Sequence, residues 1–160
     1  MAIRTFVDAG SPIHVFRRAH MANYQTTPYP LAMVICDAVY QDQATGKFFL
    51  LGLFSTIGAT EFPCTHPTMV VFVSLTDGLG DVSLRLELVH VKDEDKPVCQ
   101  FDQAVTTDDP RTVIECIFRI DGVVIPEAGE YRLKLFANDE FLIERRIIVH
   151  SAKKGGGLDE

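Results

Sequence analysis

Short apolar segments, each about as long as one β-strand, alternate along this chain with turns built from Gly, Pro, Asp and Asn. In the clearest segment, residues 82–91, Val82, Leu84, Leu86 and Leu88 share one face and polar side chains take the other. This period-two alternation is typical of a strand with one buried and one solvated face. No ten-residue stretch combines a 3.6-residue apolar period with helix caps. The sequence therefore predicts an all-β fold with little or no helix.

Comparable segments recur along most of the chain. They cover residues 31–40, 48–54, 68–76, 97–105, 112–120 and a closing hairpin at 126–149. The connection between the first two contains Asp42 and Gly46, which suit a hairpin loop with one left-handed residue. About seven to nine strands over this length predict an antiparallel β-sandwich of the immunoglobulin-like class, with a C2-like sandwich as the alternative.

Length and composition suit one globular domain. Of the 160 residues, 47% are hydrophobic and 23% are charged, which is ordinary for a domain with its own core. Residues 1–30 lack periodicity and are interpreted as an amino-terminal arm, partly disordered or lying on the domain, with Met21 as an alternative start. Residues 31–150 form the predicted sandwich. Residues 151–160 combine glycine with charge, so we expect a flexible tail.

The sequence indicates neither membrane insertion nor secretion. Its longest apolar run, residues 48–54, is far shorter than the roughly 20 residues that span a bilayer. The amino terminus lacks a continuous apolar segment with a cleavage pattern, so we expect a cytoplasmic protein. The cysteines agree with a reducing compartment, because their spacing is wide and irregular. They are Cys36, Cys64, Cys99 and Cys116.

The charge of the chain argues against a nucleic-acid partner. The sequence contains 15 basic and 22 acidic residues, for a net charge of −7, and the basic residues are scattered. Such a protein offers no basic face to a phosphate backbone. The glycines of residues 77–81 are flanked by aspartates where a phosphate-binding loop would place lysine. We therefore expect neither nucleic-acid nor nucleotide binding.

Cys64 and His66 are the only candidates for a reactive pair, in a predicted loop bounded by Pro63 and Pro67. Nucleophilic catalysis also needs placed oxyanion donors and a group that orients the imidazole. The sequence shows neither a glycine-rich elbow nor an acid at a recognisable spacing. We therefore predict a protein that is not an enzyme, with no assigned catalytic residue, cofactor or metal ligand.

Acidic turns suggest an alternative function as a small-ligand or calcium-binding sandwich. Asp77 and Asp81 share one turn, residues 93–95 form a second, and residues 108–109 belong to a third. Calcium prefers clustered carboxylate oxygens, although acidic residues are also common in solvated turns. None of these turns has the spacing of a dedicated calcium loop.

The early strands are apolar on both faces, whereas the later strands alternate. A sheet in a two-layer sandwich should have one wet face, so the outer side of the early strands is expected to be covered. The covering element could be the arm, a second copy or another protein; alternatively, loops simply shield these strands. The residues assigned to this interface are Phe48, Leu50, Phe54 and Phe72. We therefore predict a non-enzymatic protein-interaction or assembly module, with a protein partner or homo-oligomer.

The order of features between residues 33 and 149 resembles a family of uncharacterised bacterial proteins known only as a domain of unknown function. The features are Cys-Asp at the end of the first strand, Thr-Gly-Lys in the hairpin, Gly-x-Phe, Phe-Pro before His-Pro, Leu-Thr and the closing Gly-Glu-Tyr. The resemblance implies a cytoplasmic β-sandwich without assigned activity. The amino-terminal arm departs from this family, which begins close to the first strand.

Overall fold

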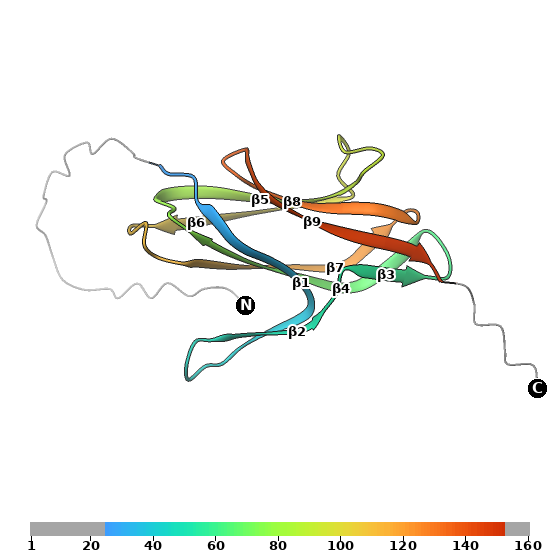
Figure 1. Cartoon of the computed structure of the whole chain (residues 1–160), viewed down its shortest axis with the longest axis horizontal. Coiled ribbons are helices and arrows are strands. Elements are labelled where there is room, and N and C mark those ends of the chain that lie inside the picture. The colour runs from blue at the N-terminus through green and yellow to red at the C-terminus, as the bar shows by residue number, and fades with distance from the viewer. Residues whose placement is uncertain (1–24, 153–160) are drawn as a thin grey trace, which may run out of the picture.

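The computed structural model describes residues 25–152, which form nine β-strands and no helix (Figure 1). The all-β prediction is confirmed. The described part of the chain has no helix long and apolar enough to cross a membrane. In chain order the strands are β1 (Tyr29–Gln41), β2 (Phe48–Leu53), β3 (Thr56–Ala59), β4 (Cys64–Thr76), β5 (Gly80–His90), β6 (Cys99–Thr107), β7 (Ile114–Ile125), β8 (Gly129–Ala137) and β9 (Glu140–Ser151).

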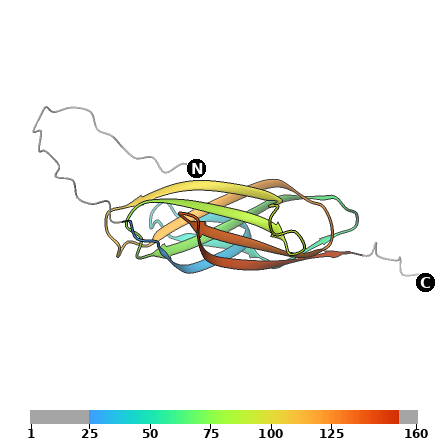
Figure 2. The ribbon, with the colours of Figure 1, turned by 90° about the horizontal axis from the view of Figure 1, so that it is seen from above.

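The strands form two sheets that lie one above the other (Figures 1 and 2). One sheet has the order β2-β1-β4-β7, and all its neighbours are antiparallel. The other has the order β3-β9-β8-β5-β6, in which only β3 and β9 are parallel. The chain crosses between the sheets at β3 and returns at β4, so both sheets contain strands from distant parts of the sequence.

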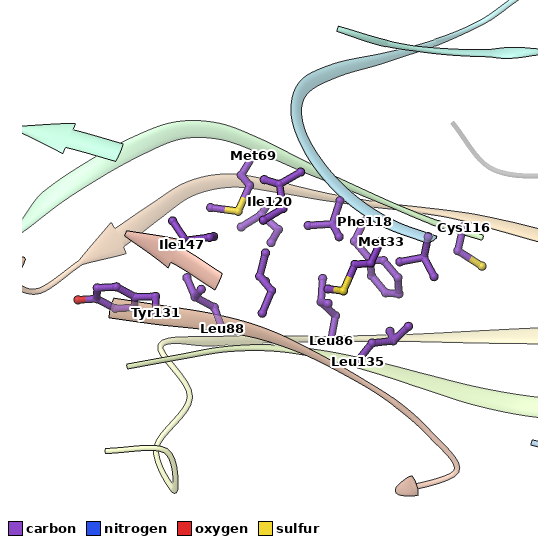
Figure 3. Close-up of a cluster of buried hydrophobic side chains, with 14 of the residues drawn as sticks. Met33, Met69, Leu86, Leu88, Cys116, Phe118, Ile120, Tyr131, Leu135 and Ile147 are labelled. Carbon is purple, nitrogen blue, oxygen red and sulfur yellow. The ribbon is translucent and has the colours of Figure 1, made fainter. Parts of the chain in front are cut away.

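The hydrophobic core lies between the sheets and contains side chains from both (Figure 3). The alternation predicted for β5 is confirmed, because Val82, Leu84, Leu86 and Leu88 are buried and the residues between them are not. Each such side chain contributes about 1.5–3 kcal/mol through burial. Strand β4 supplies the opposing row, which consists of Met69, Val71, Val73 and Leu75.

The loop predicted around Cys64 and His66 is wrong, because both residues belong to the first part of β4. The ladder between β4 and β7 skips only Pro67, which has no amide hydrogen to donate. This proline lies beyond Val70, where the pairing of β4 with β1 ends, so no β1 partner is lost. A proline is therefore tolerated here because one side of the strand is open.

The predicted hairpin loop after β1 is confirmed. The Asp42 amide donates to the Lys47 carbonyl over 2.9 Å, and the Gly46 amide donates to the Asp42 carbonyl over 2.7 Å. The Asp42 carboxylate accepts hydrogen bonds from the Ala44 amide and the Thr45 hydroxyl. Gly46 has a φ of 71°, the left-handed conformation that glycine adopts without strain.

The two predicted terminal segments fall mostly outside the described residues. Of the arm at residues 1–30, only residues 25–30 are described, and the last two already belong to β1. Thr26 forms an isolated antiparallel bridge with Leu79. Of the tail at residues 151–160, only Ser151 and Ala152 are described, and Ser151 is still part of β9.

Tyr131 anchors the connection between β7 and β8. Its hydroxyl donates to the Glu127 carbonyl over 2.8 Å, and its ring packs edge-on against His90 at a centroid distance of 4.6 Å. The His90 Nδ1 atom accepts a hydrogen bond from the Lys92 amide over 3.1 Å. These contacts join the end of β5 to the start of β8.

We predict that Tyr131→Phe lowers the free energy of unfolding by about 1 kcal/mol, because the Glu127 carbonyl loses its partner near the core. Urea unfolding monitored by circular dichroism measures the change. Tyr29→Phe is the matched control. Because the Tyr29 side chain is exposed, the free energy of unfolding of this variant should equal that of the wild type. Equal stability of wild-type protein and Tyr131→Phe would contradict the anchoring role.

Candidate interaction surface

Strand β1 changes partner halfway along its length. Its first part pairs with β4 and ends at the pair Cys36–Val70. Its second part pairs with β2, from Cys36–Leu53 to Gln41–Phe48. The hairpin of residues 36–53 therefore bends away from β4 and β7, as the blue and teal strands below them show (Figure 1).

The hairpin folds back onto the outer face of β4. The Phe48 ring lies 5.6 Å from the Phe72 ring between centroids, tilted by 55°. Phe72 is only 8% exposed, and Val70 and Ser74 on the same face are also buried. Val39 and Leu50, which form a cross-strand pair in the hairpin, are half-buried. The doubly apolar character of β4 is thus explained by a cover from the same chain.

The residues assigned to an interface on the outer face, Phe48, Leu50, Phe54 and Phe72, are largely covered within the single chain. Phe72 is buried, and the other three are half-buried. Because side chains alternate along a strand, a shift of one residue exchanges the two faces. Both faces of residues 48–53 are apolar, so the sequence contains no signal that distinguishes the covered face from the open one.

The other side of the hairpin is an exposed apolar surface, which we call the hairpin face. Its four large side chains are each 51–63% exposed. They are Tyr40, Phe49, Leu51 and Leu53. Tyr40 and Phe49 form a cross-strand pair with ring centroids 6.1 Å apart, and Leu51 pairs with Ala38. Contiguous exposed apolar groups of this kind are typical of contact surfaces.

Gly52 allows β2 to lie close to the Asp37 side chain of β1. Its φ of 68° is a conformation that other residues rarely adopt, and a Cβ atom there would lie 2.1 Å from the Asp37 Oδ2 atom. The Asp37 carboxylate therefore lies over the position of the missing side chain. Only glycine satisfies both the backbone conformation and this contact.

The free edge of β2 differs from the other free edges among the described strands. Exposed edges are usually protected by charge, by proline or by short length. Strands β6, β7 and β9 each contain charged residues, and β3 is only four residues long. Strand β2, with the sequence FFLLGL, has six residues and no charge. The hairpin thus combines an apolar face with an unprotected edge.

Cys64 and His66 lie two residues apart in β4, each beside apolar side chains. Cys64 packs against the hydrophobic core, and the His66 ring lies 5.5 Å from the Phe54 ring between centroids. The His66 Nε2 atom is buried and has no hydrogen-bond partner among the described residues. The partner that would orient a catalytic imidazole is thus missing at this nitrogen among residues 25–152.

All four cysteines are free, and burial raises the pKa of three of them. Burial raises the pKa of the Cys99 thiol to about 11 and that of the Cys116 thiol to about 11. Burial also raises the pKa of Cys36. Because thiolates are the reactive form, these three groups are poor nucleophiles.

The acidic turns do not come together in the described structure. Glu94 pairs with Lys134, and Asp109 pairs with Arg111 across 2.9 Å. The Asp81 carboxylate accepts a hydrogen bond from Thr106. Between residues 25 and 152, no three His, Cys, Asp or Glu side chains are grouped so as to hold a metal ion. This geometry gives no support to the calcium alternative.

Comparison with known families agrees with the order of motifs in the sequence. Residues 31–150 match the model of a family described as a family of unknown function (DUF6941), which confirms the resemblance to an uncharacterised family. No curated protein matches the chain. The matched residues include the whole hairpin and all nine strands, apart from the first two residues of β1 and the last residue of β9.

We predict that Cys99 and Cys116 react with iodoacetamide at pH 8 at least about tenfold more slowly in the folded protein than in urea, because their raised pKa values leave little thiolate. Mass spectrometry of labelled peptides measures each rate separately. Equal rates in the folded and unfolded protein would show that burial does not protect these thiols.

Proposed function

Because the chain belongs to the DUF6941 family, whose function is unknown, we propose a function from its own surface: a non-enzymatic module that binds another protein chain. The observation that supports this proposal most directly is the hairpin face, with four large apolar side chains more than half exposed. Desolvation of such aromatic and aliphatic groups is the main source of affinity in protein interfaces.

The free edge of β2 supports the same proposal. An unpaired, uncharged edge strand can add a strand from a partner through backbone hydrogen bonds. In this hairpin the edge lies beside Phe49 and Leu51, so one partner segment would contact both the backbone and the apolar side chains. The partner is either a second copy of the chain or a different protein.

We propose that the architecture is immunoglobulin-like. The order β1-β4-β7 corresponds to strands A, B and E of that class, and β9-β8-β5-β6 corresponds to G, F, C and C′. Tyr131 supports this reading, because it lies near the start of β8 and its hydroxyl bonds to a backbone carbonyl four residues upstream. A tyrosine in this position is a hallmark of the class. The β2 hairpin is then an insertion after the first strand.

We also propose a cytoplasmic location and no nucleic-acid partner. The four free cysteines support a reducing compartment. The net charge of −7 supports the absence of a nucleic-acid surface.

We predict that the double variant Phe49→Ser/Leu51→Ser weakens complex formation at least about tenfold, because two apolar anchors are lost. The full chain is cross-linked in its native cells, and the extract is separated by size exclusion. Wild-type chain is expected in species larger than its own 17.8 kDa, and the variant at the monomer position.

Phe141→Ser/Val113→Ser is the matched control, since those residues are equally exposed but lie outside the hairpin. It should leave the complex intact. A wild-type chain that is monomeric both in the extract and after purification would overturn the proposed function.

A further inference from the structure

Arg145 occupies an unexpected place in β9. It pairs with Leu133 of β8 and lies between Ile143 and Ile147, in the row of β9 residues that faces the core. Its side chain is nevertheless exposed. The neighbouring charges are paired, since Glu144 contacts Arg132 and Arg146 contacts Glu130 across 3.2 Å. Among residues 25–152, no carboxylate forms an ion pair with Arg145.

Two segments of the chain, residues 54–56 and β9, diverge beside this arginine, and we call this place the fork. The Ser55 carbonyl accepts a hydrogen bond from the Ile148 amide over 3.0 Å, so β3 begins to follow β9 at this point. The preceding residue pairs with the other sheet instead, because the Phe54 amide donates to the Ile35 carbonyl of β1 over 3.2 Å. The segment before β3 therefore diverges from β9 and leaves an opening next to Arg145.

The opening contains two adjoining bays that share Ser55 and Arg145. The polar bay, of about 380 Å³, is lined by these two residues together with Thr56, Glu144, Arg146 and Ile148. The apolar bay, of about 200 Å³, is lined by the shared pair together with Val34, Ile35, Leu53 and Phe54. Arg145 thus stands between hydroxyl groups on one side and apolar side chains on the other.

We propose that this fork binds a carboxylate that is attached to an apolar group. The Arg145 guanidinium would hold the carboxylate through charge-assisted hydrogen bonds, with the Ser55 and Thr56 hydroxyls as further donors. The apolar group would fill the bay beside Leu53 and Phe54. The inference does not depend on the proposed partner of the hairpin face, although Leu53 belongs to both surfaces.

Such a ligand has two sources, a free organic acid or an acidic side chain within an apolar peptide. An inward charge on an edge strand also has a competing explanation, because it discourages pairing with other strands. That explanation requires a charge but no neighbouring bay or hydroxyl donors. The two explanations differ in what Arg145→Gln does to binding and to self-association.

The experiment titrates the full ¹⁵N-labelled chain with octanoate and, in a second arm, with the peptide Val-Leu-Glu-Leu-Val. Octanamide and Val-Leu-Gln-Leu-Val are the uncharged counterparts. We expect amide shifts at Ser55, Thr56 and Arg145 for one or both charged probes, with binding at least about tenfold tighter than for the uncharged counterpart. The arm that binds more tightly identifies the source.

Arg145→Gln should abolish the preference for the charged probes, while Arg119→Gln on the other sheet should leave it unchanged. Arg145→Lys should retain part of the preference for charged probes, because the charge remains but the planar guanidinium with its paired donors is lost. Equal binding of charged and uncharged probes, or no shifts at millimolar concentration, would overturn the inference. Self-association of Arg145→Gln without any probe binding to the wild type would also overturn it and assign the arginine to edge protection.

Discussion

Strand β4 is buried on both faces over residues 69–75, and each face requires a separate cover. Its inner row, which includes Val71 and Val73, packs against the five-stranded sheet. Its outer face is covered locally by the hairpin, where the Phe48 ring packs at a tilt against the Phe72 ring. Burial of apolar surface is the dominant favourable contribution to folding, so this central strand links the two sheets and the hairpin into one unit.

The hairpin that covers β4 is itself apolar on both sides. The exposed apolar surface therefore lies on the outer side of the hairpin instead of on β4. The inner side of the hairpin is half-buried, while Tyr40, Phe49 and Leu51 on the outer side face solvent. A surface that served only as a cover would be stable with polar residues on its outer side. The apolar outer side and the uncharged edge of β2 are therefore the features that internal packing does not explain.

The reactive side chains of the chain are mostly engaged in structure. Cys116 is buried in the core, the His66 ring lies near Phe54, and the acidic side chains at the turns contact lysine, arginine or threonine partners. Arg145 differs, because it belongs to the core-facing row of β9, in the part that β3 does not pair with, and has no carboxylate partner among the described residues. Its surroundings have hydroxyls on one side and apolar groups on the other.

The sequence alone determined most of the strand segments, the turn at Asp42 and Gly46, and the buried row of β5, because each depends on local conformation or on the alternation of apolar and polar residues. It did not indicate β3 or the first part of β4. It could not determine which face of β2 is open, since both faces are apolar and only the fold-back onto Phe72 distinguishes them. The position of Cys64 and His66 in a strand likewise depended on where β1 stops pairing with β4. The surroundings of Arg145 arise from the divergence of β3 and β9, because two segments about 90 residues apart meet there and only tertiary packing brings them together.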